Sequence, residues 1–251
     1  MRRPRISPGV WTVLILAALA LLWEWAAAGG RINPFYFSSP SAVWRTFRDL
    51  AAAGTLQKHF LVTVQEAALG LLFGGVLGTL AGLGLGISPR VSTALTPLLT
   101  GLNGVPKLAL GPLFIIWLGL GLGSKVLIAG LMVFFVFAFN LYAGVRSVDR
   151  ALVLSVRLLG ATRGQTVRKV LWPASLPWLM ASLRTGLGLS LSGAVVGEYL
   201  GASKGMGWAI SAAGERYDTA SVLCYVLVIV VLVVVLDCVL RAVERYVLRW
   251  Q

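Results

Sequence analysis

Long apolar stretches alternate with short polar segments along the whole chain. A helix of about 20 apolar residues crosses the ~30 Å of hydrocarbon in a bilayer, because its rise is about 1.5 Å per residue. Six stretches meet that requirement, so the pattern predicts an all-α membrane protein with six transmembrane helices. They are the run that follows Arg5 and the segments 60–89, 91–118, 126–145, 170–197 and 220–240.

The first apolar run has two interpretations. It carries no charge between Arg5 and Glu24, which suits a transmembrane helix, whereas a cleaved signal peptide has an apolar core of only about 7–15 residues. Trp11 near one end and Trp25 at the other favour a helix anchored at both membrane interfaces. A signal peptide is the alternative, because the three alanines after Trp25 resemble a cleavage site.

Residues 29–58 are more polar than the runs on either side. Ser39 followed by Pro40 is a typical helix start, and Gly54 is a suitable stop. We expect a helix between them that lies on the outer membrane surface or against the bundle. His59 follows as the single histidine of the chain, and a structural role is favoured because a zinc site needs at least three protein ligands.

Composition agrees with a membrane protein. Hydrophobic residues make up 58% of the chain and charged residues 12%, about half the charged fraction of a soluble domain. The net charge of +13 does not indicate a nucleic-acid partner, because the basic residues cluster at the ends of the apolar runs. Cys224 and Cys238 lie in the last run and imply neither a metal site nor a disulfide.

A basic segment at residues 146–177 is the longest polar interruption in the second half of the chain. Its cations face one acid, Asp149, so the segment is expected on the cytoplasmic side of a membrane. These cations are Arg146, Arg150, Arg157, Arg163, Arg168 and Lys169.

Two short helices are predicted within this basic segment. Asp149 can cap a helix over residues 150–159, and Gly160 suits the left-handed conformation that ends it. Thr162 and Gln165 have the spacing of a capping box, so a second helix should begin directly after Thr162.

The second span carries a glycine at every fourth position, which on a helix makes a groove that a neighbouring helix can approach closely. Two interpretations stay open and are compatible: a sliding interface in a protein that changes conformation, or tight static packing. The glycines do not form a nucleotide-binding fingerprint, because no Gly-x-Gly-x-x-Gly follows a strand. They are Gly70, Gly74, Gly78, Gly82 and Gly86.

The third span contains three prolines, among them Pro106, and the polar residues Asn103 and Lys107. Proline frees backbone carbonyls, and a spanning helix tolerates this only where protein or water satisfies them. Asn103, Pro106 and Lys107 are therefore candidates for lining a translocation path.

The fifth span contains Arg184. An arginine at a helix centre costs about 2.5–3.5 kcal/mol, whereas each Leu or Val returns only about 0.3–0.6 kcal/mol, so this helix should face protein or water. Arg184, Ser190 and Glu198 are further candidates for the path. The alternative is that Arg184 pairs with Glu66 of the second span, which we interpret as the only acid deep in the membrane.

The distribution of basic residues orients the six spans. Thirteen of the 22 Lys and Arg residues fall on the side that carries both termini, so the positive-inside rule predicts both termini in the cytoplasm. In this topology residues 119–125 form a short outer turn, and residues 201–217 form an outer loop with a short helix. Seven basic residues fall outside: Arg31, Arg45, Arg48, Lys58, Lys125, Lys204 and Arg216.

The basic segment resembles the cytoplasmic signature of the inner-membrane permease subunits of binding-protein-dependent ABC importers. That signature reads Glu-Ala-Ala, three residues, Gly, nine residues, an aliphatic residue, one residue and Leu-Pro. Gly160, Val170 and Pro173 keep its spacing, whereas Leu154-Ser155-Val156 replaces Glu-Ala-Ala and Trp172 replaces Leu.

Other motifs extend the resemblance over nearly the whole chain and are typical of the nitrate, sulfonate and taurine subgroup. Glu66 departs from that subgroup, in which a basic residue usually stands at this position. The motifs that match are Ser39-Pro40-Ser41, Gly111-Pro112-Leu113 with Trp117, Ser124-Lys125 and Arg249-Trp250.

The resemblance implies a type I ABC importer permease fold in a bacterial inner membrane. It implies a subunit that is not an enzyme and binds no cofactor, with ATP and Mg on a cytoplasmic ATPase dimer. Further partners would be a second permease copy, in a homodimer or heterodimer, an external solute-binding protein and membrane lipid. Coupling to the ATPase would fall on Leu154, Ser155, Val156, Arg157, Gly160, Ala161, Arg163 and Thr166.

Three regions follow from this resemblance. Residues 1–56 would form the N-terminal transmembrane helix and external surface helix, residues 57–245 the transmembrane core with the coupling segment at 146–169, and residues 246–251 a cytoplasmic tail.

Lys107 and Arg184 favour an oxyanion such as nitrate, a sulfonate or taurine as substrate, and a pyrimidine or vitamin precursor is the alternative. A self-contained channel or secondary transporter is a further alternative, although such proteins usually place acids and histidines along their spans. An intramembrane hydrolase is disfavoured, because Ser190 has no histidine near it in the sequence and Gly-x-Ser-x-Gly is absent.

Overall fold

The computed structural model describes the backbone of residues 8–247 and the side chains of residues 10–246. All regular elements in this part of the chain are helices, which confirms the predicted all-α class. Arg5, from which the first apolar run was counted, and the Arg249-Trp250 motif lie outside the described residues. The predicted boundaries at 56/57 and 245/246 stay predictions.

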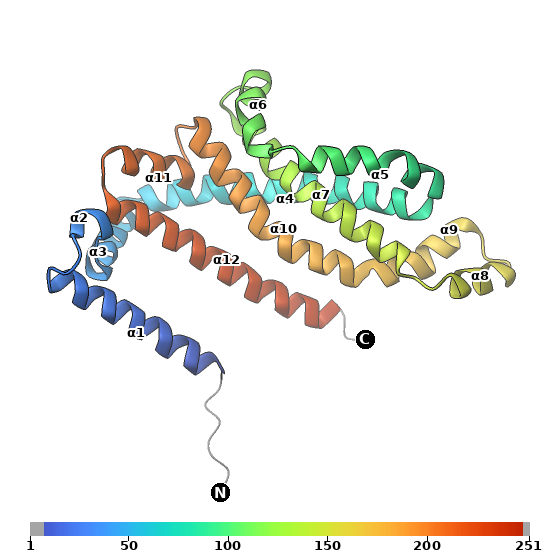
Figure 1. Cartoon of the computed structure of the whole chain (residues 1–251), viewed down its shortest axis with the longest axis horizontal. Coiled ribbons are helices and arrows are strands. Elements are labelled where there is room, and N and C mark those ends of the chain that lie inside the picture. The colour runs from blue at the N-terminus through green and yellow to red at the C-terminus, as the bar shows by residue number, and fades with distance from the viewer. Residues whose placement is uncertain (1–7, 248–251) are drawn as a thin grey trace, which may run out of the picture. The chain divides into compact units, whose positions relative to one another are not determined.

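The chain divides into two compact units. Unit 1 comprises Met1–Lys58 and Ala209–Ile229, and unit 2 comprises His59–Trp208 and Val230–Gln251. Figure 1 labels the helices of both units.

Unit 1 contains α1 (Pro8–Ala28), α2 (Pro34–Phe37) and α3 (Pro40–Ala52). Ser39 caps α3 through a 3.2 Å bond from the Ala42 N–H to its Oγ, and Gly54 has a φ of 71° just beyond the helix end, so the predicted start and stop are confirmed. The carboxylate of Glu24 accepts hydrogen bonds from the backbone N–H and the hydroxyl of Ser41, at 2.9 and 2.8 Å. These bonds join α1 to the start of α3.

Five helices are long and apolar enough to cross a membrane, and a bent pair counts as a sixth span when its halves are taken together. The pair is α5 (Pro89–Gly104) with the segment Lys107–Leu118, which includes α6 (Gly111–Leu118), and the two halves meet at 81°. The break lies at Val105 and Pro106, within the proline-interrupted span. The five others are α1, α4 (Thr55–Ile87), α7 (Leu122–Arg146), the segment Arg163–Gly201 that contains α10 (Trp172–Gly201), and α12 (Thr219–Val247).

The structure corrects the predicted turn at residues 119–125, because α7 already begins at Leu122. Lys125 is buried in the first turn of this helix. Its ammonium donates to the carbonyl oxygens of Leu120 and Gly121, at 2.5 and 3.0 Å. The carbonyl groups at the start of α7 therefore bind the ammonium of Lys125, a residue that we expected on the outer surface. The predicted helix within 201–217 is present as α11 (Met206–Glu215).

Helix α7 forms the centre of unit 2. Ile128, Ala129, Val133, Ala138 and Leu141 are completely buried. A helix this inaccessible needs neighbours on several sides, and the glycines of α4 and α10 provide them.

The glycines of α4 lie directly against α7. A Cβ atom added to Gly70 would lie 2.5 Å from the Cβ of Ala129, and one added to Gly78 would lie 2.5 Å from the carbonyl oxygen of Phe134. Gly74 approaches the backbone of Gly130 in the same way. Because Cβ atoms in proteins do not come this close to other atoms, these positions of α4 require glycine. We call this contact between α4 and α7 the glycine seam.

We predict that Gly74→Ala destabilises the fold, whereas Gly84→Ala in the same helix does not. The added methyl at position 74 would collide with the backbone of Gly130, and overpacking of this kind costs about 1–3 kcal/mol. Nothing lies within 4 Å of a Cβ at position 84. Thermal unfolding of the purified protein in detergent should give a lower melting temperature for Gly74→Ala alone, and an equal decrease in both variants would contradict the packing interpretation.

Candidate coupling segment and translocation path

The basic segment folds into the two short helices that the sequence predicts. Helix α8 (Arg150–Leu158) begins at Asp149, whose side chain accepts a 2.8 Å hydrogen bond from the Ala151 N–H. Gly160 follows with a φ of 87°. The predicted cap and the predicted left-handed stop are both confirmed.

A capping box starts the second helix of the segment. The Thr162 N–H donates to the side-chain oxygen of Gln165 at 2.8 Å, and the Gln165 N–H donates to the Thr162 hydroxyl at 3.3 Å. Helix α9 (Arg163–Thr166) then passes through a π-helical segment, Val167–Leu171, into α10. The coupling segment is therefore continuous with the long helix α10.

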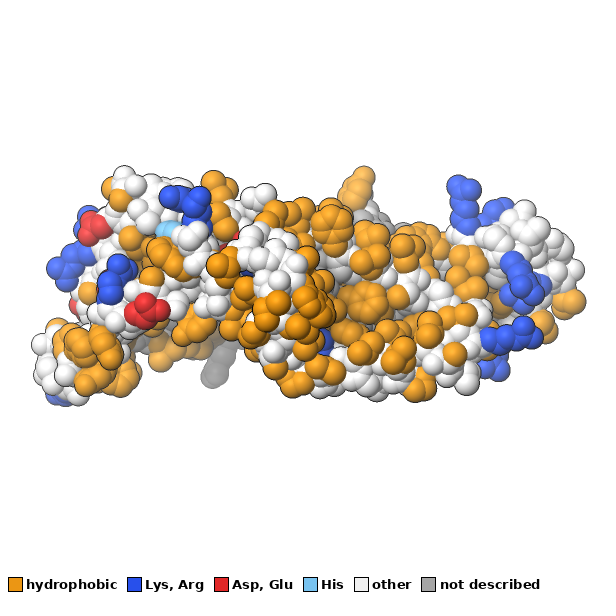
Figure 2. Space-filling model, turned by 90° about the horizontal axis from the view of Figure 1, so that it is seen from above, with side chains coloured by type: hydrophobic (Ala, Val, Ile, Leu, Met, Phe, Trp, Pro, Cys, Tyr) orange, Lys and Arg blue, Asp and Glu red, His pale blue; other side chains and the backbone are white. Residues whose placement is uncertain are grey.

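The surface of this segment combines cations with exposed apolar side chains. Leu158 and Leu159 are 82% and 87% exposed, and Leu154 is exposed beside them. Arg157 and Arg163 are exposed as well, and Figure 2 shows basic side chains gathered around α8 and α9. Exposed leucines beside cations are typical of a protein-binding surface.

The remaining coupling candidates are less exposed or support the fold. Thr166 is completely buried and its hydroxyl donates to the Thr162 carbonyl at 3.0 Å. The hydroxyl of Ser155 donates to the Ala151 carbonyl at 2.9 Å, and Val156 and Ala161 are half-buried. The structure thus leaves Leu154, Arg157 and Arg163 of the predicted set available to a partner, and adds the exposed Leu158 and Leu159, which the sequence analysis did not single out.

Lys107 and Asn103 form a local polar pair at the break between α5 and α6. The Lys107 ammonium donates to the backbone carbonyl of Asn103 at 2.6 Å and to its side-chain oxygen at 2.9 Å. It also lies 4.8 Å from the centre of the Phe135 ring. Pro106 precedes the short 3-10 helix that carries Lys107. The lysine therefore satisfies a backbone carbonyl that the helix break leaves free.

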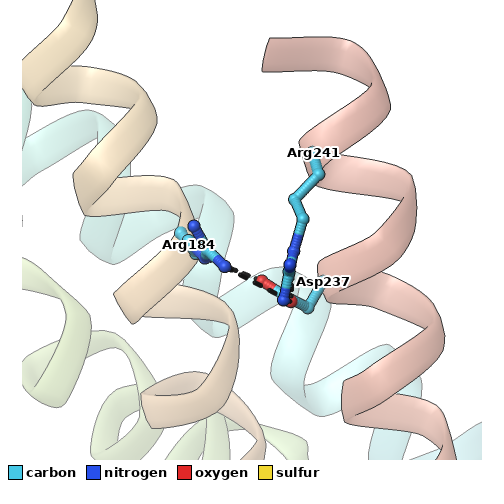
Figure 3. Close-up of polar contacts among 3 residues, drawn as sticks. All are labelled: Arg184, Asp237 and Arg241. Carbon is cyan, nitrogen blue, oxygen red and sulfur yellow. Dashed lines mark hydrogen bonds and ion pairs between the residues drawn. The ribbon is translucent and has the colours of Figure 1, made fainter. Parts of the chain in front are cut away.

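Arg184 pairs with Asp237 of α12, and not with Glu66 as the alternative interpretation proposed. The Nε of Arg184 lies 2.8 Å from Oδ1 of Asp237. Arg241, one turn further along α12, donates to the other oxygen of the same carboxylate with its Nε at 2.8 Å. Figure 3 shows the carboxylate between the two guanidinium groups, so the cluster carries a net positive charge.

Glu198 lies in a buried polar cluster. Its two oxygens accept hydrogen bonds from the Thr63 hydroxyl and from the Gly207 N–H, each at 2.6 Å. Ser190 is buried on the same helix and donates to the carbonyl of Leu187 at 3.0 Å. Arg184, in contrast, has 46% of its side chain exposed. The path candidates therefore lie in different environments within unit 2.

Sequence reasoning missed Asp237 and the partners of Glu198. Asp237 lies in the sixth span, which was counted among the apolar stretches, so the expectation that Glu66 is the only deep acid was wrong. Its signal was Arg241, four residues later, the spacing of an ion pair on one helix face. Thr63 gave no comparable signal, because its bond to Glu198 joins residues far apart in the sequence.

Comparison with protein families identifies the chain. Residues 74–249 match the family described as the inner membrane component of binding-protein-dependent transport systems. The chain belongs to this family. The permease is thus a transport subunit of the bacterial inner membrane, and the resemblance inferred from the sequence is confirmed.

Individual relatives place the permease near the expected subgroup. It is 34% identical to a putative aliphatic sulfonates transport permease protein of Bacillus subtilis (strain 168), with 95% of this chain and 87% of the relative covered. It is 32% identical to a taurine transport system permease protein of Escherichia coli (strain K12), over 94% and 87%. A riboflavin transport system permease protein of Chloroflexus aurantiacus is 31% identical, over 97% and 91%.

A solved structure confirms the fold. A chain of the MetNI methionine ABC transporter, described in inward-facing conformations, superposes with a TM-score of 0.68 at 21% identity. The match covers 74% of the permease and 93% of that chain. The predicted type I importer permease fold is thereby confirmed.

We predict that Asp237→Asn destabilises the permease more than Arg184→Gln does. Neutralising Asp237 leaves two arginines without their carboxylate, whereas neutralising Arg184 leaves Asp237 paired with Arg241. Melting temperatures in detergent should follow that order. The exchange variant Arg184→Asp/Asp237→Arg should recover part of the loss, and equal melting temperatures for both single variants would contradict the shared-carboxylate arrangement.

Proposed function

We propose that the permease forms the translocation path of an ATP-driven importer for sulfonates such as taurine. The observation that carries this proposal is its similarity, at 34% and 32% identity over nearly its whole length, to permeases named for aliphatic sulfonates and taurine. A solute-binding protein outside the membrane would deliver the substrate.

The ATPase would bind from the cytoplasm at the coupling segment, residues 146–169. Exposed leucines at the end of α8 and the exposed Arg157 and Arg163 support a docking role. This orientation places both termini in the cytoplasm, in agreement with the excess of basic residues on that side. ATP and Mg would bind to the ATPase dimer, and the permease itself would not hydrolyse ATP.

A second permease copy would complete the path. A homodimer requires only this chain, and a heterodimer would pair it with a related subunit. Membrane lipid would surround the apolar outer faces, including that of α1. Only 6% of the residues in the apolar stretch of this helix are buried.

The charge of the Arg184 cluster supports an anionic substrate. Two guanidinium groups share one carboxylate, so one positive charge stays uncompensated within the cluster. Arginine is well suited to sulfonate and similar oxyanions, because its planar guanidinium presents several N–H donors in a fixed geometry. In this proposal Arg184 and Lys107 lower the cost of bringing an anion into the membrane.

Uptake measurements test the substrate. The permease is reconstituted with its partner ATPase and solute-binding protein, and uptake of taurine, an alkanesulfonate, nitrate and riboflavin is compared with and without ATP. We expect ATP-dependent uptake of the sulfonates. Selective uptake of riboflavin would favour the vitamin alternative, to which the 31% identical relative points, and uptake without the ATPase would contradict the proposed mechanism.

The coupling role of Gly160 is tested by a matched pair of variants. Gly160 has a φ of 87°, which a residue with a side chain adopts only at a cost of about 1–2 kcal/mol. Gly164, four residues later in α9, has no such conformation and no atom within 4 Å of an added Cβ. We predict that Gly160→Leu abolishes ATP-dependent uptake, that Gly164→Leu retains most of it, and that both insert into the membrane normally. Equal uptake by the two variants would contradict the role of Gly160.

A further inference from the structure

An apolar groove runs along the surface of unit 2 between α4 and α10. Its volume is about 470 Å³, and Thr79 is the one polar side chain among the described residues that line it. Phe137 of α7 is 2% exposed and lies beneath Gly75, where an added Cβ would come 3.3 Å from the Phe137 ring. Gly75 is not one of the glycines spaced four apart in the glycine seam, so its missing side chain serves the groove.

Helix α12 covers α4 and α10 beyond one end of this groove. Its side chains pack against Ala67 of α4 and Leu191 of α10, and its Asp237 binds Arg184. The groove begins next to these residues, at Ala68 and Leu183. Further along α4, the apolar side chains that line it stay open to the surroundings. Their exposed fractions are 57% for Leu72, 50% for Val76 and 63% for Leu80.

The groove has the length of one membrane leaflet. Its lining residues fall within 68–80 of α4 and 172–183 of α10, which correspond to about 17–18 Å along a helix axis. Half of the hydrocarbon layer measures about 15 Å. Because α10 continues from the coupling segment at residue 172, the groove occupies the half of unit 2 that lies next to this segment.

Cations lie at the end of the groove that is near the coupling segment. Trp172 lines the groove there and is half-buried. Arg168 and Lys169 precede it by about one helical turn, are exposed, and form no ion pair with an acid among the described residues. Tryptophan is typical of the headgroup level of a membrane, and basic pockets between transmembrane helices bind anionic headgroups.

The volume of the groove favours a lipid chain over a helix as its occupant. A helix with side chains is 10–12 Å wide, so a piece about 17 Å long fills roughly 1,300 Å³ or more. The groove offers only about 470 Å³. An acyl chain is far narrower than a helix and carries no polar group, as the apolar lining requires.

We propose that the groove binds one acyl chain of an anionic phospholipid, whose phosphate group binds to Arg168 and Lys169. The guanidinium presents N–H donors in a fixed geometry to phosphate oxygens, and the ammonium adds a point charge. The lipid would lie at the π-helical segment Val167–Leu171, through which the coupling segment passes into α10. The inference rests on the proposed orientation of the permease only in that the site belongs to the cytoplasmic leaflet.

Native mass spectrometry of the full-length permease in detergent measures the binding of added phosphatidylglycerol and phosphatidylcholine. We expect one phosphatidylglycerol to bind per chain in preference to phosphatidylcholine. Arg168→Gln and Lys169→Gln should each lower the affinity for phosphatidylglycerol about fivefold, the usual contribution of one cation near an anionic headgroup. The control Arg150→Gln removes an exposed cation of α8 that does not adjoin Trp172, and should leave the affinity unchanged.

A second matched pair of variants tests the acyl-chain part of the site. Val76 lines the groove and is 50% exposed, so Val76→Trp should fill it and abolish the preference for phosphatidylglycerol. Leu77, the next residue of α4, is 58% exposed and does not line the groove. Leu77→Trp should therefore bind phosphatidylglycerol as the native protein does.

The proposal is overturned if the native permease binds both lipids equally, or if Val76→Trp and Leu77→Trp bind phosphatidylglycerol equally well. Binding by a monomer that is lost in the dimer would assign the groove to the second permease copy and also overturn the proposal. If Val76→Trp does not fold, Arg168→Gln and Lys169→Gln decide, because an unchanged affinity in both would exclude the headgroup site. Uptake is not measured, so the result is separate from that of the transport experiments.

Discussion

Close contact between helix backbones is the constraint on which unit 2 depends. Helices in lipid gain nothing by exchanging a lipid contact for an equally apolar side chain, so their association relies on tight packing and internal polar bonds. Helix α7 is approached from one side by Gly70, Gly74 and Gly78 of α4 and from another by Gly193 of α10, where an added Cβ would lie 2.6 Å from the Cα of Ala129. The coupling segment connects α7 to α10, so both of its ends are anchored in this glycine-dependent packing.

The polar groups inside the spans follow from the same constraint. Backbone and side-chain polar atoms in hydrocarbon must find partners within the protein. Lys125 binds two carbonyls at the start of α7, and Asp237 binds Arg184 and Arg241. Each of these groups thus has hydrogen-bonding partners within the protein. The two arginines together still carry one positive charge more than the carboxylate that they share. The proposed interaction with an anion uses this excess and requires no further charged residue.

The sequence predicted those features that are set by neighbouring residues. The cap at Asp149, the capping box at Thr162 and the left-handed Gly160 involve partners within a few positions, so residue type and spacing suffice. The glycine pattern of α4 predicted a close helix contact but could not identify α7 as the partner. Asp237 was missed because the surrounding valines dominate the hydrophobic pattern, and the Glu198 cluster was missed because its bonds join α4, α10 and α11 over separations that no local pattern records.

Helix length adds a consequence for the membrane. Helix α4 has 33 residues, which correspond to about 50 Å along its axis, whereas the hydrocarbon layer is only about 30 Å thick. A helix of this length must tilt strongly or project into the headgroup region and beyond. Because the glycine seam holds α4 tightly against α7, the two helices must tilt together. Bilayer thickness thus acts on the inclination of the pair as a whole, and a thinner or thicker membrane should alter how far residues 146–169 stand from the lipid surface.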